Sequence, residues 1–164
     1  MSNYLGIDIG KDGGISVVDE NSKILHKCVM PVIAGEDLDV ILIEDILIKY
    51  KPKHCVLEKL HGMAHWGVKT NFELGGQYHL VKGILTLNSV PFTAVIPKMW
   101  QKEMFEGIRV IEKNDKIDTK AMAEVAVKRL FPTEDFRKSD RSKNTHNGII
   151  DAVLMASFCS RKFR

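Results

Sequence analysis

Residues 3–19 read NYLGIDIGKDGGISVVD, and this stretch decides how the rest of the chain is interpreted. The pattern predicts a short apolar strand, a glycine-rich turn over residues 10–14 and a second strand over residues 15–19, which together form a hairpin. Asp8 stands between two isoleucines in the middle of the first strand. Because an unpaired buried carboxylate costs several kcal/mol, a lysine, a group of hydrogen bonds or a metal ion must compensate its charge.

The remaining sequence predicts a third strand and then an alternation of helices and strands. Further strands are expected at Ile24–Met30, His54–Leu57 and Phe92–Ile96, and helices at Gly35–Tyr50, Asn71–Leu87, Asp118–Leu130 and from Asn147 onward. Three strands in succession indicate a meander, whereas strands joined through helices are typical of parallel crossovers. We therefore expect an α/β fold with a mixed five-stranded sheet and helices on both faces. Without repeats or linkers, the chain is expected to form one domain over residues 1–164.

The composition is that of a globular cytoplasmic protein. No apolar run approaches the roughly 20 residues of a membrane span, and a strand begins near the N-terminus, so neither a membrane segment nor a signal peptide is expected. The three cysteines form no CxxC pair, which favours reduced thiols over disulfides or zinc. The nucleotide-binding patterns GxxxxGKS/T and GxGxxG are absent, so no nucleotide cofactor is expected.

Three carboxylates lie where predicted elements meet. Asp8 is in the first strand, Glu58 follows the fourth, and Asp151 is expected in the first turn of the last helix. Adjacent parallel strands would bring Asp8 and Glu58 together, and the last helix could place Asp151 over the same edge. Oxygen ligands of this kind suit Mg²⁺ or Mn²⁺. Each residue also has an ordinary interpretation: a buried hydrogen-bonded aspartate, a solvated strand end, and a carboxylate stabilised by the helix dipole. Together they favour a metal site.

An ordered set of motifs resembles a known family. The motifs are LGIDIG (5–10) with its glycine turn, VLEKLHG (56–62), LGGQYHLVKGIL (74–85), IPKMWQK (96–102) and HNGIIDAVLMASF (146–158). Their order is similar to that in the RuvC-like Holliday junction resolvases of the ribonuclease H-like superfamily, most of all in the short phage-encoded branch. The resemblance implies a homodimer that binds four-way and other branched DNA and makes paired nicks, using Mg²⁺ or Mn²⁺, with two ions per active site. An enzyme of that branch would act in the cytoplasm of the bacterial host.

The resemblance also assigns the metal ligands and reveals a departure. Asp8, Glu58 and Asp151 match the metal-binding positions of the family, which also has an aspartate, or sometimes a histidine, three or four residues before the last ligand. Here these positions are Gly148 and Asn147, preceded by His146. Asn147 through its carbonyl oxygen, or His146, is expected to replace the missing carboxylate, which should weaken the second metal. The alternatives are that Asn147 caps the helix and that His146 contacts a phosphate or orients water.

Candidate DNA contacts are basic residues and one aromatic residue. The basic ones are Lys102, Lys120, Arg137, Lys138, Arg141 and Lys143, which would give salt-dependent binding largely independent of sequence. Trp66 lies with His61 and His65 in the loop that follows Glu58. The resemblance implies that this loop approaches the junction centre, where Trp66 could stack on an unpaired base. Trp66 could equally pack on its own loop.

Other interpretations remain open at this point. The IDIGKDGG stretch also resembles the first phosphate loop of actin-like and sugar kinases, but those proteins need a second domain that 164 residues cannot hold. The missing carboxylate makes a branched-DNA binding protein with little or no cleavage activity an alternative, and a broad fork and flap nuclease is another. Gly75, Gly76 and Gly83 could form the dimer contact or pack against their own sheet.

Overall fold

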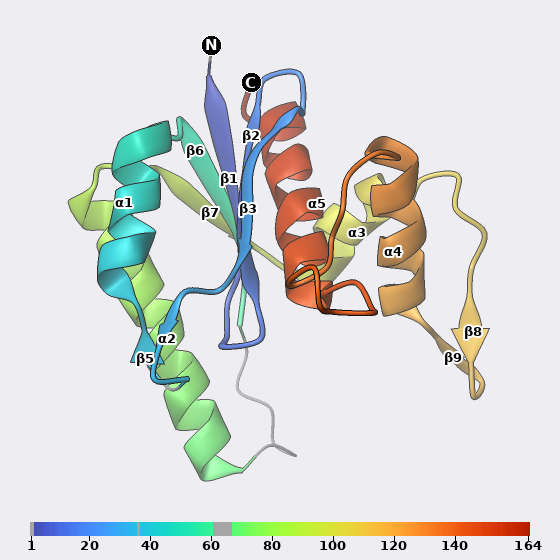
Figure 1. The fold of residues 1–164 in the computed structure, drawn as a ribbon, viewed down its shortest axis with the longest axis horizontal. Coiled ribbons are helices and arrows are strands. Elements are labelled where there is room, and N and C mark those ends of the chain that lie inside the picture. Colours follow the sequence, from blue (N-terminus) through green and yellow to red (C-terminus); the bar gives the residue numbers. More distant parts are fainter. Residues whose placement is uncertain (1, 36, 61–66) are drawn as a thin grey trace.

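The computed structural model describes residues 2–35, 37–60 and 67–164 (Figure 1). Its centre is a mixed five-stranded sheet with strand order β3-β2-β1-β6-β7. The strands are β1 (Asn3–Asp8), β2 (Gly14–Asp19), β3 (Ile24–Val29), β6 (His54–Glu58) and β7 (Phe92–Val95). The first three strands are antiparallel, whereas β6 runs parallel to both β1 and β7. The predicted sheet, a meander followed by parallel strands, is therefore confirmed.

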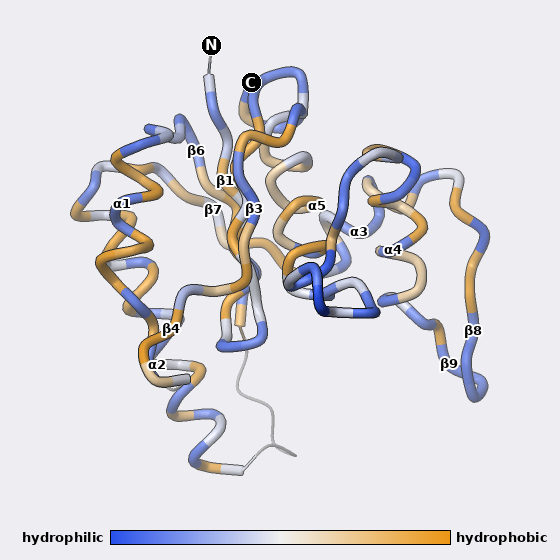
Figure 2. The backbone as a smooth tube through the Cα atoms, in the orientation of Figure 1, coloured by the Kyte–Doolittle hydropathy of each residue, from blue (hydrophilic) through white to orange (hydrophobic). Residues whose placement is uncertain are grey.

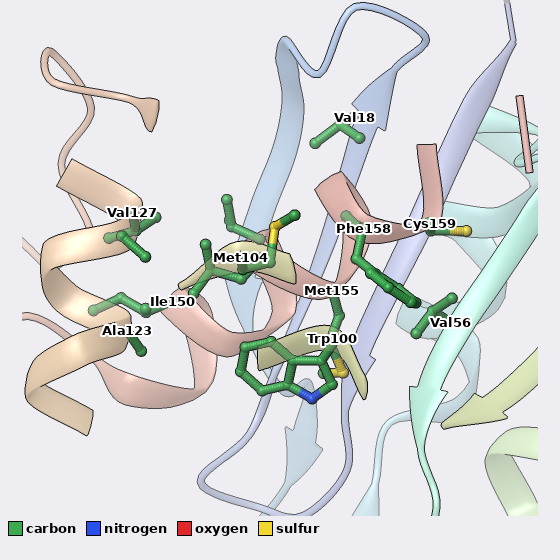
Figure 3. Packing of buried hydrophobic residues seen from close by; sticks show 14 of the residues in the cluster. Val18, Val56, Trp100, Met104, Ala123, Val127, Ile150, Met155, Phe158 and Cys159 are labelled. Carbon is green, nitrogen blue, oxygen red and sulfur yellow. The ribbon is translucent and has the colours of Figure 1, made fainter. Parts of the chain in front are cut away.

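Helices cover both faces of this sheet (Figure 1). On one face lie α1 (Val40–Tyr50) and α2 (Val68–Leu87), and on the other lie α3 (Pro97–Met104), α4 (Thr119–Leu130) and α5 (Asn147–Lys162). Each face has its own hydrophobic cluster. The cluster under α5 contains Trp100 and Met104 of α3, Ala123 and Val127 of α4, and Ile150, Met155 and Phe158 of α5 (Figure 3).

Strand alternation determines which side chains face α5. Leu5, Ile7 and Leu57 belong to the cluster under α1 and α2, whereas Tyr4 and Val56 belong to the cluster under α5. Because successive side chains of a strand point to opposite faces, the residues at positions 6, 8 and 58 face α5. The two carboxylates at the ends of β1 and β6 are thus on the α5 side of the sheet.

Some helix boundaries differ from those predicted. The segment before α1 forms a small antiparallel hairpin of β4 (Val32–Ile33) and β5 (Asp37–Leu38), so α1 begins at Val40 and not at Gly35. Asp39 caps α1 by accepting a hydrogen bond from the Leu42 amide at 3.1 Å. Helix α2 begins three residues before the predicted start. Asp118 caps α4, as predicted, by accepting from the Ala121 amide at 3.0 Å.

A further helix and a further hairpin were not predicted. Helix α3 starts directly after β7 with Pro97 at its first position, where a proline needs no hydrogen bond. The hairpin of β8 (Glu112–Lys113) and β9 (Lys116–Ile117) extends away from the sheet (Figure 1). Its turn residues Asn114 and Asp115 both have positive φ, which short polar side chains tolerate. Among the described residues, no helix combines the length and apolarity required to cross a membrane.

Candidate active site

The sheet places Asp8 and Glu58 next to each other. In the parallel pairing of β1 with β6, Ile7 lies opposite Leu57, and Asp8 and Glu58 are the next residues of their strands. Asp8 is the last residue of β1, so its predicted place in the middle of the strand was wrong. Its side chain is only partly exposed. The strand ends there because the chain turns at Gly10, whose φ is 127°.

Close backbone contacts position α5 against this edge. A side chain at Gly148 would overlap the backbone of Asp12 and Gly13, so the start of α5 touches the turn that follows Asp8. A side chain at Gly6 would overlap the backbone of Ala152 and Ala156. The stretch from 148 to 152 therefore runs along β1, and this brings Asp151 to Asp8. Asp151 is the fifth residue of α5, beyond the predicted first turn, so the helix dipole gives little reason for its presence.

The three carboxylates influence one another electrostatically. Burial raises the pKa of Asp8 well above its usual value, and the charges of Asp151 and Glu58 raise it further. Burial and the charge of Glu58 raise the pKa of Asp151 to about 7. Burial also raises the pKa of Glu58. Carboxylates that oppose one another's ionisation in this way form a concentration of negative charge that a cation would relieve.

The donor set fits a hard divalent cation. Carboxylate oxygens are the preferred ligands of Mg²⁺ and Mn²⁺, and the site offers three of them at one sheet edge. No group of three or more His, Cys, Asp or Glu side chains within residues 2–35, 37–60 and 67–164 is already close enough together to hold a metal ion. The carboxylates therefore share one region of the molecule without forming a closed, preassembled cage.

The fourth position of the site has no carboxylate and no room for one at residue 148. Gly148 is buried against the turn after Asp8, whereas Asn147 is exposed as the first residue of α5. His146, and not Asn147, is the N-cap, and its Nδ1 accepts a hydrogen bond from the Ile149 amide at 3.4 Å. The possibility that Asn147 serves as the cap is thereby corrected. Burial and the charge of Lys138 lower the pKa of His146 below its usual value, and the charge of Asp12 offsets part of this effect.

The predicted basic residues divide into different environments. The ammonium group of Lys120, near the start of α4, lowers the pKa of both Asp8 and Asp151, which places it at the carboxylates. Arg137 instead binds Asp135 through Nε and Nη2 and donates to the carbonyl oxygens of Asp140 and Ser142. Its guanidinium group therefore stabilises the loop of residues 135–142 to which Arg137 itself belongs.

The remaining basic candidates are exposed. Lys102 lies in the last turn of α3, and Lys138, Arg141 and Lys143 lie in the hydrophilic segment before α5 (Figure 2). Trp66 and His61 lie outside the described residues.

Two residues near the site were not identified from the sequence. Trp100 of α3 is only 1% exposed. Its indole N–H partly offsets the effect of burial, which raises the pKa of Glu58. The sequence signal was the IPKMWQK motif, but its tryptophan could be assigned to the interior only once α3 was known. The second is Asp12, an acidic residue whose backbone lies against Gly148 at the start of α5.

The fold is shared with Holliday junction resolvases of known structure. RuvC of T. thermophilus in complex with a Holliday junction substrate matches with a TM-score of 0.67 and 16% sequence identity, covering 98% of this chain and 96% of that chain. Another Thermus thermophilus RuvC structure gives a TM-score of 0.66 at 19% identity, covering 97% and 95% of the two chains. The yeast mitochondrial Holliday junction resolvase Ydc2 gives 0.60 at 16% identity, covering 98% of this chain and 78% of that chain.

At these identities the likeness is one of fold, and the chain has the ribonuclease H-like fold of RuvC. The amino-acid sequence matches no protein-family model and no curated protein sequence.

Proposed function

We propose that the chain is a metal-dependent endonuclease that binds four-way and other branched DNA and hydrolyses phosphodiester bonds, as a homodimer that makes paired nicks. The observation that carries this proposal is the meeting of Asp8, Glu58 and Asp151 at one edge of a ribonuclease H-like sheet, where the charge of Glu58 raises the pKa of Asp8 and of Asp151. The similarity in fold to a RuvC bound to a Holliday junction supports branched DNA as the substrate.

Asp8, Glu58 and Asp151 would hold Mg²⁺ or Mn²⁺, with two ions per site. Bound there, divalent ions supply activation of the attacking water and stabilisation of the leaving oxygen. Asn147 precedes Asp151 by four residues, so both side chains lie on the same side of α5, and its amide oxygen is the fourth ligand in this proposal. His146 is less available, because its Nδ1 already accepts the hydrogen bond that caps α5.

The DNA backbone would be held by the basic residues around the carboxylates. Lys120 would contact the phosphate that reacts, which is supported by the effect of its charge on the pKa of Asp8 and Asp151. Lys102, Lys138, Arg141 and Lys143 would contact phosphates further away, which makes the affinity salt-dependent. Arg137 would contribute by keeping the segment before α5 in shape, because its guanidinium is bound to Asp135.

Helix α2 is the proposed contact between the two copies. A Cβ atom added at Gly75, Gly76 or Gly83 would meet nothing within 4 Å among the described residues. These glycines are therefore not needed for packing of α2 against its own sheet. Phe72 and Leu87 on the same helix are 82% and 86% exposed. A groove of about 580 Å³ between α2 and β5 lies beside Phe72. In a symmetric dimer, this groove would receive the Phe72 side chain of the second copy.

The residue at position 148 favours one competing function. Because neither Asn147 nor Gly148 supplies the fourth carboxylate, and residue 148 has no room for one, a branched-DNA binding protein with little or no cleavage activity is the alternative. A broad fork and flap nuclease would share the same site and differ only in the DNA structures that it accepts. As part of the same proposal, residues 1–164 form one nuclease domain of the phage-encoded branch, which acts in the cytoplasm of the bacterial host.

Cleavage of synthetic DNA substrates distinguishes these functions. A four-way junction, a fork, a flap and a linear duplex are incubated with the protein in Mg²⁺ or Mn²⁺. We expect paired nicks in the four-way junction and no cleavage of the duplex. Tight binding to the junction without cleavage in either metal would establish the binding protein instead. Equal cleavage of junction, fork and flap would establish the broader nuclease.

A further inference from the structure

Trp100 is a buried residue with a polar indole N–H group. It is 1% exposed and packs edge-to-face on Phe105, with ring centroids 5.9 Å apart and planes at 77°. Figure 3 shows the indole under Met104, with its nitrogen on the ring edge turned away from that side chain. The ring therefore belongs to the hydrophobic core under α5, and its nitrogen is buried with it.

The indole nitrogen is a buried donor without a hydrogen-bond partner of ordinary geometry in the described part of the chain. A buried donor left in this state costs about 1–3 kcal/mol. Phenylalanine has no such donor, although its smaller ring would leave part of the space unfilled. The N–H group itself is therefore the feature that needs an explanation.

The carboxylate of Glu58 is the group that lies near this donor. Glu58 pairs with Val95 across β6 and β7, and the Lys59 amide donates to the Val95 oxygen at 2.7 Å. Helix α3 begins two residues after Val95, and Trp100 is its fourth residue, about one helical turn from that start. Trp100 and Val56 of β6 belong to the same hydrophobic cluster, and Glu58, two residues after Val56, is on the same face of the strand.

We propose that Trp100 is a positioning residue, whose indole N–H donates a hydrogen bond to one carboxylate oxygen of Glu58 and so turns the other oxygen toward the divalent ion. This inference rests on the proposed function and adds a residue to it. Groups that hold a metal ligand in orientation typically change metal affinity when they are removed, although they do not touch the metal. Trp100 touches neither the substrate nor the metal in this arrangement.

The test compares Trp100→Phe, which removes the N–H and keeps an aromatic ring, with Phe105→Leu, which disturbs the packing of the same ring pair. Binding of Mn²⁺ and Mg²⁺ to the protein without DNA is measured by calorimetry, and thermal unfolding of each variant is recorded. We expect Trp100→Phe to weaken metal binding about tenfold, whereas Phe105→Leu leaves it within about twofold of the wild-type value. Unchanged metal affinity in Trp100→Phe, or an equal loss in both variants, would overturn the role of the N–H.

A spectroscopic measurement separates this inference from the proposed function. Metal addition should change the tryptophan emission of the wild-type protein and leave that of Trp100→Phe unchanged. If the wild type binds Mn²⁺ and cuts the junction but the two emission responses are equal, only the role of Trp100 is overturned. If the wild type binds neither ion, the proposed function is overturned together with it.

Discussion

Glycines occupy two regions of the molecule with opposite surroundings. At the α5 interface, side chains at Gly6 or Gly148 would overlap the backbone of a neighbouring element. On α2, side chains at Gly75, Gly76 and Gly83 would meet nothing within 4 Å among the described residues. Glycine is thus required where α5 presses Asp151 against Asp8, and it is dispensable for the fold of a single chain on α2. The same residue type marks the site in one region and an open helix face in the other.

The contrast between the two groups of glycines predicts the largest change in the free energy of unfolding. Gly6→Ala should lower the free energy of unfolding by about 3 kcal/mol or more, because the backbone of α5 cannot move away without exposing the core. The matched change Gly76→Ala should raise it by about 0.5–1 kcal/mol, since alanine favours a helix. Chemical denaturation at low protein concentration measures both. A mild effect of Gly6→Ala would show that α5 is not held closely on β1.

The vacant fourth position allows a sharper test at the α5 interface. Gly148→Asp should destabilise the protein by about 2–3 kcal/mol and restore no activity, because the new side chain overlaps the turn at Asp12 and Gly13. Asn147→Asp should preserve stability, because residue 147 is exposed, and should increase junction cleavage in Mg²⁺ relative to Mn²⁺. Cleavage rates in the two metals measure this. If Asn147→Asp has no metal-specific effect, Asn147 is not a ligand.

Repulsion among the carboxylates predicts a pH dependence of stability in the metal-free protein. The pKa of Asp151 is raised in the folded state, so its contribution to stability is greatest below about pH 4 and declines as the pH rises to about 7. Asp151→Asn should therefore match the wild type near pH 4 and exceed its free energy of unfolding by about 1–2 kcal/mol at pH 8. Denaturation at both pH values in the presence of EDTA measures the difference. An advantage of the variant that does not grow with pH would contradict this repulsion.

The outer face of α2 predicts the smallest effect on folding and a specific effect on assembly. Phe72→Ser should change the free energy of unfolding of the monomer by less than about 0.5 kcal/mol but raise the dimer dissociation constant about tenfold or more. Ile117→Ser on β9 removes another exposed apolar side chain and should leave the dimer intact. Sedimentation velocity measures both variants. A dimer unaffected by Phe72→Ser would place the interface elsewhere.

The sheet and its carboxylates could be predicted because their signals are local and repeated. Alternating apolar residues identified the strands, and Asp8 and Asp151 stood out because each interrupts an apolar run. The side of the sheet on which they meet follows from period-two alternation. The order of the elements was sufficient to predict the parallel pairing of β1 with β6 that brings Glu58 next to Asp8.

The elements that escaped prediction depend on contacts between distant residues. Pro97 was interpreted as the end of a strand, although it also begins α3, so the inward position of Trp100 could not be inferred. His146 was not expected to cap α5, because histidine is an uncommon cap compared with the asparagine that follows it. The opposite roles of the glycines on β1 and α2 depend on which backbone lies opposite them, and no pattern within either segment contains that information.

Cleavage of a four-way junction by Asp8→Asn tests the central claim most directly. The substitution keeps the shape of the side chain and removes a charge from the carboxylate group, so the metal-free variant should melt at the same temperature as the wild type or higher. Its cleavage rate in Mg²⁺ and in Mn²⁺ should fall by at least about a hundredfold, while its binding to the junction in EDTA remains. A folded Asp8→Asn protein that cuts the junction at the wild-type rate would contradict the assignment of this edge of the sheet as the active site.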